Sequence, residues 1–228
     1  CASGMMATFN GMASIQTGNA DVVLTGGTES MSNAIFYLSN ARYGVGTGNA
    51  SLKDSLTEAQ FCSQPQDIYG HFNMGMTADN VAEKYNISRE DQDAFALNSQ
   101  LKAAKAIAEG KLRDEIIPVT VPQGKKKDPI IFDTDEFPRE TSMEKLAKLK
   151  PCFKPETGTV TAGTSSGRND GASALLLMSE EKAKELGLKP LATIKSMASA
   201  GVDPRYMGLG PVPATKKALK LAGLSMDD

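Results

Sequence analysis

Apolar residues recur at helical spacing near the start of the chain and then give way to a short apolar run. Residues 4–17 carry an apolar stripe, which predicts a helix closed by Gly18, and the stripe consists of Met5, Met6, Phe9, Met12 and Ile15. The β-branched run at residues 21–25 ends at Gly26 and Gly27, which predicts a buried strand. A helix followed by a strand at this spacing is typical of a layered α/β fold.

The same two patterns return in the last third of the chain, and a different region lies between them. Further helices are predicted at residues 77–85, 88–110 (behind a capping box at Ser88), 142–150 (behind Ser142), 180–186 and 213–221. Further strands are predicted at residues 116–121, 130–132, 172–178 and 191–196. This order predicts an α/β domain that is interrupted by a helix-rich insertion.

Two polar segments inside this insertion have alternative interpretations. Residues 32–67 show little periodicity, and a loop of that length is uncommon in a compact domain, so we interpret it as functional or inserted. Its glycine-rich run at residues 44–48 follows no predicted strand and opens no predicted helix, which argues against a dinucleotide-binding motif. The lysines at residues 125–127 indicate a solvated loop tip or, alternatively, a phosphate contact.

Charge, hydropathy and cysteine content exclude several classes of function. The 228 residues include 25 Lys and Arg against 27 Asp and Glu, so no basic surface for nucleic acid is indicated. The longest apolar stretch, residues 172–178, is too short to span a membrane. Three cysteines without metal-site spacing, Cys1, Cys62 and Cys152, predict neither a disulfide framework nor a metal site. Reduced thiols fit a cytoplasmic location.

Cys1 stands directly before the first predicted helix. A thiol in that position meets unpaired backbone N–H groups and the positive end of the helix dipole, and both favour the reactive thiolate. The sequence therefore indicates a nucleophile, with a buried and inert cysteine as the alternative. A first residue that is Cys, and residues 224–228 that resemble a helix start, indicate a fragment of a longer protein.

Five groups of residues stand in a fixed order along the chain: residues 1–5, 26–32, 74–80, 158–172 and 201–213. Together they resemble the thiolase family, in particular its biosynthetic acetyl-CoA C-acetyltransferase branch. The resemblance covers nearly the whole chain and implies a layered α/β/α fold. It assigns residues 1–33 and 170–191 to the N-terminal half, 34–169 to an inserted loop domain that holds coenzyme A, and 192–228 to a truncated C-terminal half.

The resemblance implies an acyltransferase of fatty acid metabolism that joins two acetyl-CoA molecules, reversibly, into acetoacetyl-CoA and CoA. Cys1 would carry the acyl intermediate, and CoA thioesters would be substrates without a cofactor or metal. Ser166 matches a serine that contacts the pantetheine arm of CoA, or is merely a small residue in a tight turn. Ala162 and Gly163 lie where a larger side chain would block that arm. The other matching positions are Arg139, at the nucleotide end of CoA, and Met74 and Met207, which line the acyl pocket or belong to the core.

Departures from the family pattern leave alternatives open. Asn73 stands where many acetyl-transferring members have His, and Thr164 stands where Asn is usual. The alternatives are a degradative 3-ketoacyl-CoA thiolase of broader chain length, a non-catalytic acyl-CoA-binding member of the family, and a hydrolase built from Cys1 and His71.

The resemblance also implies that an activating histidine and a second cysteine come from a C-terminal half beyond these residues. We therefore expect the 228-residue chain to be inactive by itself. The full-length protein is expected to be a cytoplasmic homodimer or homotetramer.

Overall fold

The computed structural model describes residues 2–125 and 127–228, so Cys1 and Lys126 lie outside the described residues. The chain forms two compact units. The first unit holds the described residues up to Met74 together with Arg168–Asp228, and the second holds Gly75–Gly167. The second unit is therefore an insertion in the sequence of the first. The domain boundaries that the family resemblance implies stay a prediction.

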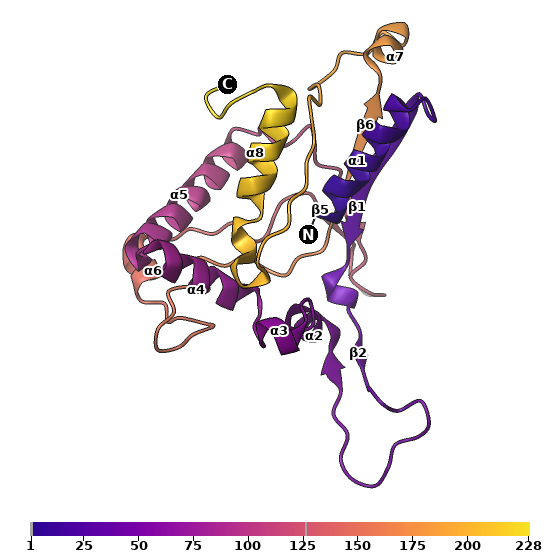
Figure 1. The fold of residues 1–228 in the computed structure, drawn as a ribbon. Helices are drawn as coiled ribbons and strands as arrows, with labels where there is room; N and C mark the ends of the chain where they lie inside the picture. Colours follow the sequence, from indigo (N-terminus) through magenta and orange to yellow (C-terminus); the bar gives the residue numbers. More distant parts are fainter. Residues whose placement is uncertain (1, 126) are drawn as a thin grey trace. The chain divides into compact units, whose positions relative to one another are not determined.

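A two-stranded antiparallel sheet with one helix against it is the centre of the first unit. Strand β1 (Val22–Glu29) pairs with strand β6 (Gly171–Met178) along their full lengths. Helix α1 (Ser3–Gln16) lies along these strands (Figure 1). The predicted helix and both predicted strands are confirmed, and β1 continues through the two glycines that the sequence analysis placed at its end.

Helix α1 approaches the sheet closely at Gly11. A Cβ added there would lie 2.5 Å from Thr25 Cγ2, 3.1 Å from Leu177 Cδ1 and 3.3 Å from Val23 Cγ1. A larger side chain would force the helix away from the strands, since packed interiors tolerate little added volume. The small residue at this position thus sets the distance between helix and sheet.

The apolar runs at residues 21–25 and 172–178 both predict buried strands, and this prediction is wrong. Thr25, on the face that meets α1, is 7% exposed. On the opposite face Leu24 is 72% exposed, and Leu176, its partner across the sheet, is 58% exposed. Successive side chains of a strand point to opposite faces, and α1 covers only one face. Within the described residues no element covers the other.

Residues 32–67 contain more regular structure than their sequence predicts. The elements in this part of the chain are the 3₁₀ turn η1 (Met31–Asn33), the antiparallel pair β2 (Phe36–Tyr37) and β3 (Lys53–Asp54), and the helices α2 (Ser55–Phe61) and α3 (Gln66–Tyr69). Helix α2 begins where the Asp54 carboxylate accepts the N–H of Leu56 at 3.1 Å. This cap, rather than apolar spacing, defines the helix, so periodicity gave no sign of it.

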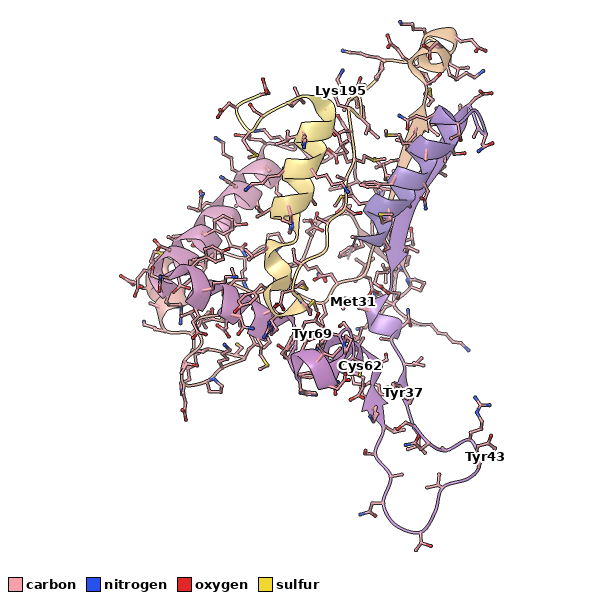
Figure 2. All side chains as sticks on the ribbon, in the orientation of Figure 1. Met31, Tyr37, Tyr43, Cys62, Tyr69 and Lys195 are labelled. Carbon is pink, nitrogen blue, oxygen red and sulfur yellow. The ribbon has the colours of Figure 1, made fainter. Side chains whose placement is uncertain are left out.

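A long loop joins β2 to β3 and carries Tyr43, whose side chain is 99% exposed (Figure 2). The glycine-rich run at residues 44–48 lies in this loop, where neither a strand leads into it nor a helix starts from it. The position of the run in this loop agrees with the reason for which the sequence argues against a dinucleotide-binding motif, and the absence of such a motif stays a prediction.

The C-terminal part of the first unit holds helix α7 (Glu180–Glu185), the 3₁₀ segment η2 (Pro204–Leu209) and helix α8 (Pro211–Ala222). Helix α8 begins two residues before the predicted start, because a proline without an N–H fits the first helical turn. The predicted strand at residues 191–196 is wrong. A strand needs a neighbour for its backbone N–H and C=O groups, and no strand in the described part of the chain pairs with this segment.

Three helices and a hairpin make up most of the second unit. The helices are α4 (Met74–Tyr85), α5 (Arg89–Ala108) and α6 (Met143–Ala147), and the antiparallel hairpin consists of β4 (Val119–Val121) and β5 (Ile130–Phe132). Ser88 and Ser142 cap α5 and α6 as predicted, because their hydroxyl oxygens accept backbone N–H groups of the first turn at 3.0 and 3.3 Å. Helix α4 begins three residues earlier than predicted.

Candidate active site

The predicted nucleophile, Cys1, lies outside the described residues, whereas the helix that follows it is described. Ala2 occupies the N-cap position of α1, and no side chain caps this end of the helix. The first turn of α1 also lacks acidic residues. The N–H groups of a first helical turn and the helix dipole favour a nearby negative charge. The start of α1 therefore suits an anionic neighbour such as a thiolate.

Two motifs from distant parts of the sequence meet at one end of the β1–β6 sheet. Asp170, just before β6, accepts the backbone N–H of Ser32 at 2.8 Å, and the Ser32 hydroxyl also donates to the same carboxylate. The two hydrogen bonds stabilise the ionised form, and they lower the pKa of Asp170 below its ordinary value, the hydroxyl bond most strongly. This carboxylate ties the end of the 26–32 motif to the start of β6.

Replacing Asp170 by asparagine is expected to make the stability of the folded chain less dependent on pH in the acid range. The pKa of Asp170 in the folded chain lies below its ordinary value. The ionised carboxylate therefore stabilises the fold at any pH above the ordinary pKa. The contribution is lost as the pH falls through the folded pKa. Urea unfolding measured at about pH 6 and about pH 3 should show a smaller difference in midpoint for Asp170→Asn than for the unsubstituted chain.

Ser32→Ala serves as the matched control, since it removes the hydroxyl donor and leaves the carboxylate in place. It should reduce the pH dependence in the same direction. An Asp170→Asn chain that keeps the full difference between the two midpoints would contradict this assignment.

In the second unit, Thr161 organises the loop that leads to Ser166. Thr161 is fully buried. Its hydroxyl accepts the N–H of Gly163 at 3.2 Å, and its carbonyl accepts the hydroxyls of Thr164 and Ser165 at 3.2 and 2.7 Å. Ser166 follows directly and is exposed. Ser166 therefore lies at the surface, in a loop whose backbone is fixed by the hydrogen bonds of the buried Thr161.

Gly163 has a packing role that the sequence analysis did not foresee. A Cβ at this position would lie 2.5 Å from Leu146 Cδ2 and 2.8 Å from Leu149 Cδ1. Leu146, on α6, is 3% exposed and has little room to move. A glycine is therefore needed for the loop to lie against these two leucines. Its role in leaving space for a pantetheine arm stays a prediction, as does that of the exposed Ala162.

Arg139 is attached to the loop that carries Ser166. Its guanidinium donates to the carbonyl oxygen of Ala162 at 3.1 Å and lies 5.2 Å from the centre of the Phe137 ring. Its backbone N–H donates to the side-chain oxygen of Gln100 at 3.0 Å. The structure thus brings Arg139, Ala162 and the Ser166 loop together. The contact of Arg139 with the nucleotide end of CoA stays a prediction.

The remaining predicted residues belong to the first unit. Met74 and Met207 are 42% and 44% exposed, so neither is a core residue in this chain. His71 is exposed, and its ring stacks on Phe61 with the centroids 4.2 Å apart and the planes 8° from parallel. The acyl-pocket roles of the two methionines and the pairing of His71 with Cys1 stay predictions.

One buried carboxylate near the Ser166 loop was missed as a functional candidate. Asp79, on α4, is only 4% exposed and accepts the backbone N–H groups of Thr159 and Val160. The signal was present in the sequence, since Asp79 lies three residues after Met76 and three before Ala82. That spacing places the carboxylate on the apolar face of the helix.

The described residues provide neither a group of metal-ligating side chains nor a helix that could cross a membrane. Among residues 2–125 and 127–228, no group of three or more His, Cys, Asp or Glu side chains is arranged to hold a metal ion. No helix in those same ranges is both long enough and apolar enough to cross a membrane.

Comparisons with known proteins identify the family. A sequence profile described as the thiolase N-terminal domain matches residues 1–181, and one described as the thiolase C-terminal domain matches residues 188–228. An acetyl-CoA acetyltransferase of Syntrophomonas wolfei is 49% identical over 228 residues, which are 100% of this chain and 56% of that protein.

Two crystal structures resemble the whole chain. One is the acetyl-CoA acetyltransferase of Bacillus anthracis, with a TM-score of 0.91 and 44% identity. The other is human mitochondrial 3-ketoacyl-CoA thiolase, with a TM-score of 0.90 and 42% identity. This chain covers 56% of each of those two chains.

The chain belongs to the thiolase family and has the thiolase α/β fold. It spans a little over half the length of the relatives that it matches.

Proposed function

We propose that the protein, at its full length, is an acetyl-CoA C-acetyltransferase that interconverts two acetyl-CoA with acetoacetyl-CoA and CoA. One observation carries the proposal. All 228 residues align, at 49% identity, with a protein named acetyl-CoA acetyltransferase. The thiolase resemblance of the motifs at residues 1–5 and 158–172 supports the same activity.

The first stage of the proposed reaction forms an acyl-enzyme. The Cys1 thiolate attacks the carbonyl carbon of acetyl-CoA, and the CoA thiolate leaves as a new thioester forms on Cys1. Thioester exchange is nearly balanced, because one thiolate replaces another. The backbone N–H of Cys1 would help to hold the oxyanion of the tetrahedral intermediate.

The second stage forms the carbon–carbon bond. A base removes an α-proton from a second acetyl-CoA, and the resulting carbanion attacks the carbonyl carbon of acetyl-Cys1. The Cys1 thiolate then leaves, and acetoacetyl-CoA is the product. The family resemblance assigns the base, and a histidine that activates Cys1, to a C-terminal half beyond these residues.

The substrate site in this proposal consists of three parts of the chain. Ser166 contacts the pantetheine arm, while Ala162 and Gly163 leave room for it. Arg139 interacts with the nucleotide end of CoA. Met74 and Met207 line the acyl pocket, where two exposed thioether side chains could adapt to a small acyl group.

Assembly and location are parts of the same proposal. A homodimer or homotetramer in the cytoplasm, without a metal or a bound cofactor, is expected from the family resemblance and from the cysteine content of the sequence.

Steady-state thiolysis by the full-length protein tests this function. Four-carbon acetoacetyl-CoA is expected to be cleaved by CoA with kcat/KM at least about tenfold above that of a long-chain 3-ketoacyl-CoA, since a small pocket rejects added methylenes. Product formation can be followed by high-performance chromatography of the CoA esters. Equal rates for both substrates would contradict an acetyl-specific enzyme, and binding of CoA without turnover would contradict an enzyme altogether.

A 3-ketoacyl-CoA thiolase of broader chain length is the second candidate. Two observations favour it: the human mitochondrial enzyme of that name is nearly as similar in structure, and Asn73 stands where many acetyl-transferring members have His. A long-chain substrate that is cleaved faster than acetoacetyl-CoA would support this candidate.

A further inference from the structure

The carboxylate of Asp79 holds two consecutive backbone N–H groups of the segment that precedes the Ser166 loop. Its Oδ1 atom accepts the N–H of Thr159 at 2.8 Å and the N–H of Val160 at 3.0 Å. Asp79 is 4% exposed and Val160 is 7% exposed, so water competes little for these bonds. Removal of a buried acceptor leaves its donors unsatisfied, which costs more than the hydrogen bonds themselves contribute. Asp79 therefore fixes this stretch of backbone to helix α4.

The backbone beside the Asp79 carboxylate leaves space for it at Gly158. A Cβ at Gly158 would lie 2.8 Å from Asp79 Oδ2 and 2.7 Å from the carbonyl oxygen of Lys154. Only a glycine allows the chain to pass this close to both groups. The N–H of Gly158 donates to the same Lys154 carbonyl at 2.7 Å, which closes the turn before Thr159. The glycine thus leaves space beside Oδ2, while Oδ1 accepts the two backbone N–H groups.

Residues 159–160, whose N–H groups Asp79 accepts, lead directly into the loop that carries Ser166. Val160, held by Asp79, is followed by the fully buried Thr161. Thr161 in turn holds Gly163, Thr164 and Ser165 through its hydroxyl and carbonyl oxygens. The hydrogen bonds of Asp79 and those of Thr161 therefore hold adjoining stretches of backbone, and together they reach the residue before Ser166.

We propose that Asp79 is a positioning residue for CoA binding, which sets the place of the Ser166 loop without touching the substrate. This inference rests on the proposed function, in which Ser166 contacts the pantetheine arm. The arm is bound alike in the ground state and in the transition state of acyl transfer. Loss of Asp79 should therefore raise KM and leave kcat nearly unchanged.

The test is steady-state thiolysis of acetoacetyl-CoA by the full-length protein and its Asp79→Ala variant. We expect Asp79→Ala to raise KM for CoA about tenfold, with kcat within about twofold of the unsubstituted enzyme. Ser88→Ala is the matched control. It removes the cap of α5 in the same unit and makes no contact with residues 158–166 among the hydrogen bonds described, so KM should stay unchanged.

A merely structural role would give a different result. If Asp79 only stabilises the fold, its loss reduces the amount of active enzyme, which lowers apparent kcat at constant KM. That outcome would overturn the inference. If Asp79→Ala does not accumulate as folded protein, Asp79→Asn decides, because the neutral amide is the weaker acceptor and should raise KM about threefold.

The inference and the proposed function fail in different ways. Absence of turnover in the unsubstituted full-length protein contradicts the proposed function, and with it the inference. The inference alone is contradicted if the unsubstituted protein is active and the Asp79→Ala variant has the same KM. Where the alanine variant does not fold, the same result for Asp79→Asn contradicts it.

Discussion

Replacing Cys1 by alanine is expected to lower kcat for acetyl transfer by the full-length protein by at least about 10⁴-fold. The proposed reaction passes through an acyl group on this sulfur, and alanine offers no atom that could carry it. Binding of CoA thioesters should persist, since the residues proposed to hold the pantetheine arm are unchanged. The variant therefore separates binding from chemistry.

Two measurements check this result. Intact-protein mass spectrometry after incubation with acetyl-CoA should show one added acetyl group on the unsubstituted protein and none on Cys1→Ala. Thiolysis rates should fall in parallel. Cys62→Ala is the matched control, because Cys62 is an exposed free thiol to which no role is assigned, and it should keep full activity.

The assignment fails if Cys1→Ala retains a rate within about tenfold of the unsubstituted protein. It also fails if the acetyl group is found on Cys62 or Cys152 instead. Either result would show that the acetyl group does not pass through Cys1.

The 228-residue chain by itself is expected to form acetoacetyl-CoA at least about 10²–10⁴-fold more slowly than the full-length protein. Removal of an α-proton needs a base, and general acid–base catalysis typically supplies that factor. The chain contains one histidine, His71, whose ring stacks on Phe61. The chain spans 56% of the length of its relatives, and the family resemblance places the missing groups in the remainder.

The measurement compares both proteins at equal concentration in the condensation and thiolysis directions. Circular dichroism must show that the short chain is folded, because Leu24 and Leu176 leave one face of its sheet exposed and association is a risk. Co-expression with the C-terminal remainder should restore activity. Ordinary turnover by the short chain alone would contradict the assignment of the base to the C-terminal half.

Local signals in the sequence determined many of the elements of this protein. The caps at Ser88 and Ser142, and the apolar stripe of α1, predicted helices that the structure contains. These signals work because each depends on residues within one or two helical turns. The ordered motifs likewise placed the chain in the thiolase family, since they need no knowledge of spatial contacts.

Contacts between distant residues could be decided only by the tertiary structure. The pairing of β1 with β6 joins residues about 150 positions apart, and the segment 191–196 is not a strand because it finds no partner among the described residues. The exposure of Leu24 likewise depends on what covers the sheet.

The candidate site shows the same division. The sequence singled out Gly163, Arg139 and Ser166, but it could not show that Gly163 packs on Leu146 or that Arg139 donates to Ala162. The sequence also could not show that Asp79 accepts the N–H groups of Thr159 and Val160. Hydrogen bonds between residues about 80 positions apart give no periodic pattern in a sequence. Residue type, spacing and the family resemblance therefore predicted which groups carry the chemistry, and long-range packing decided how those groups are held.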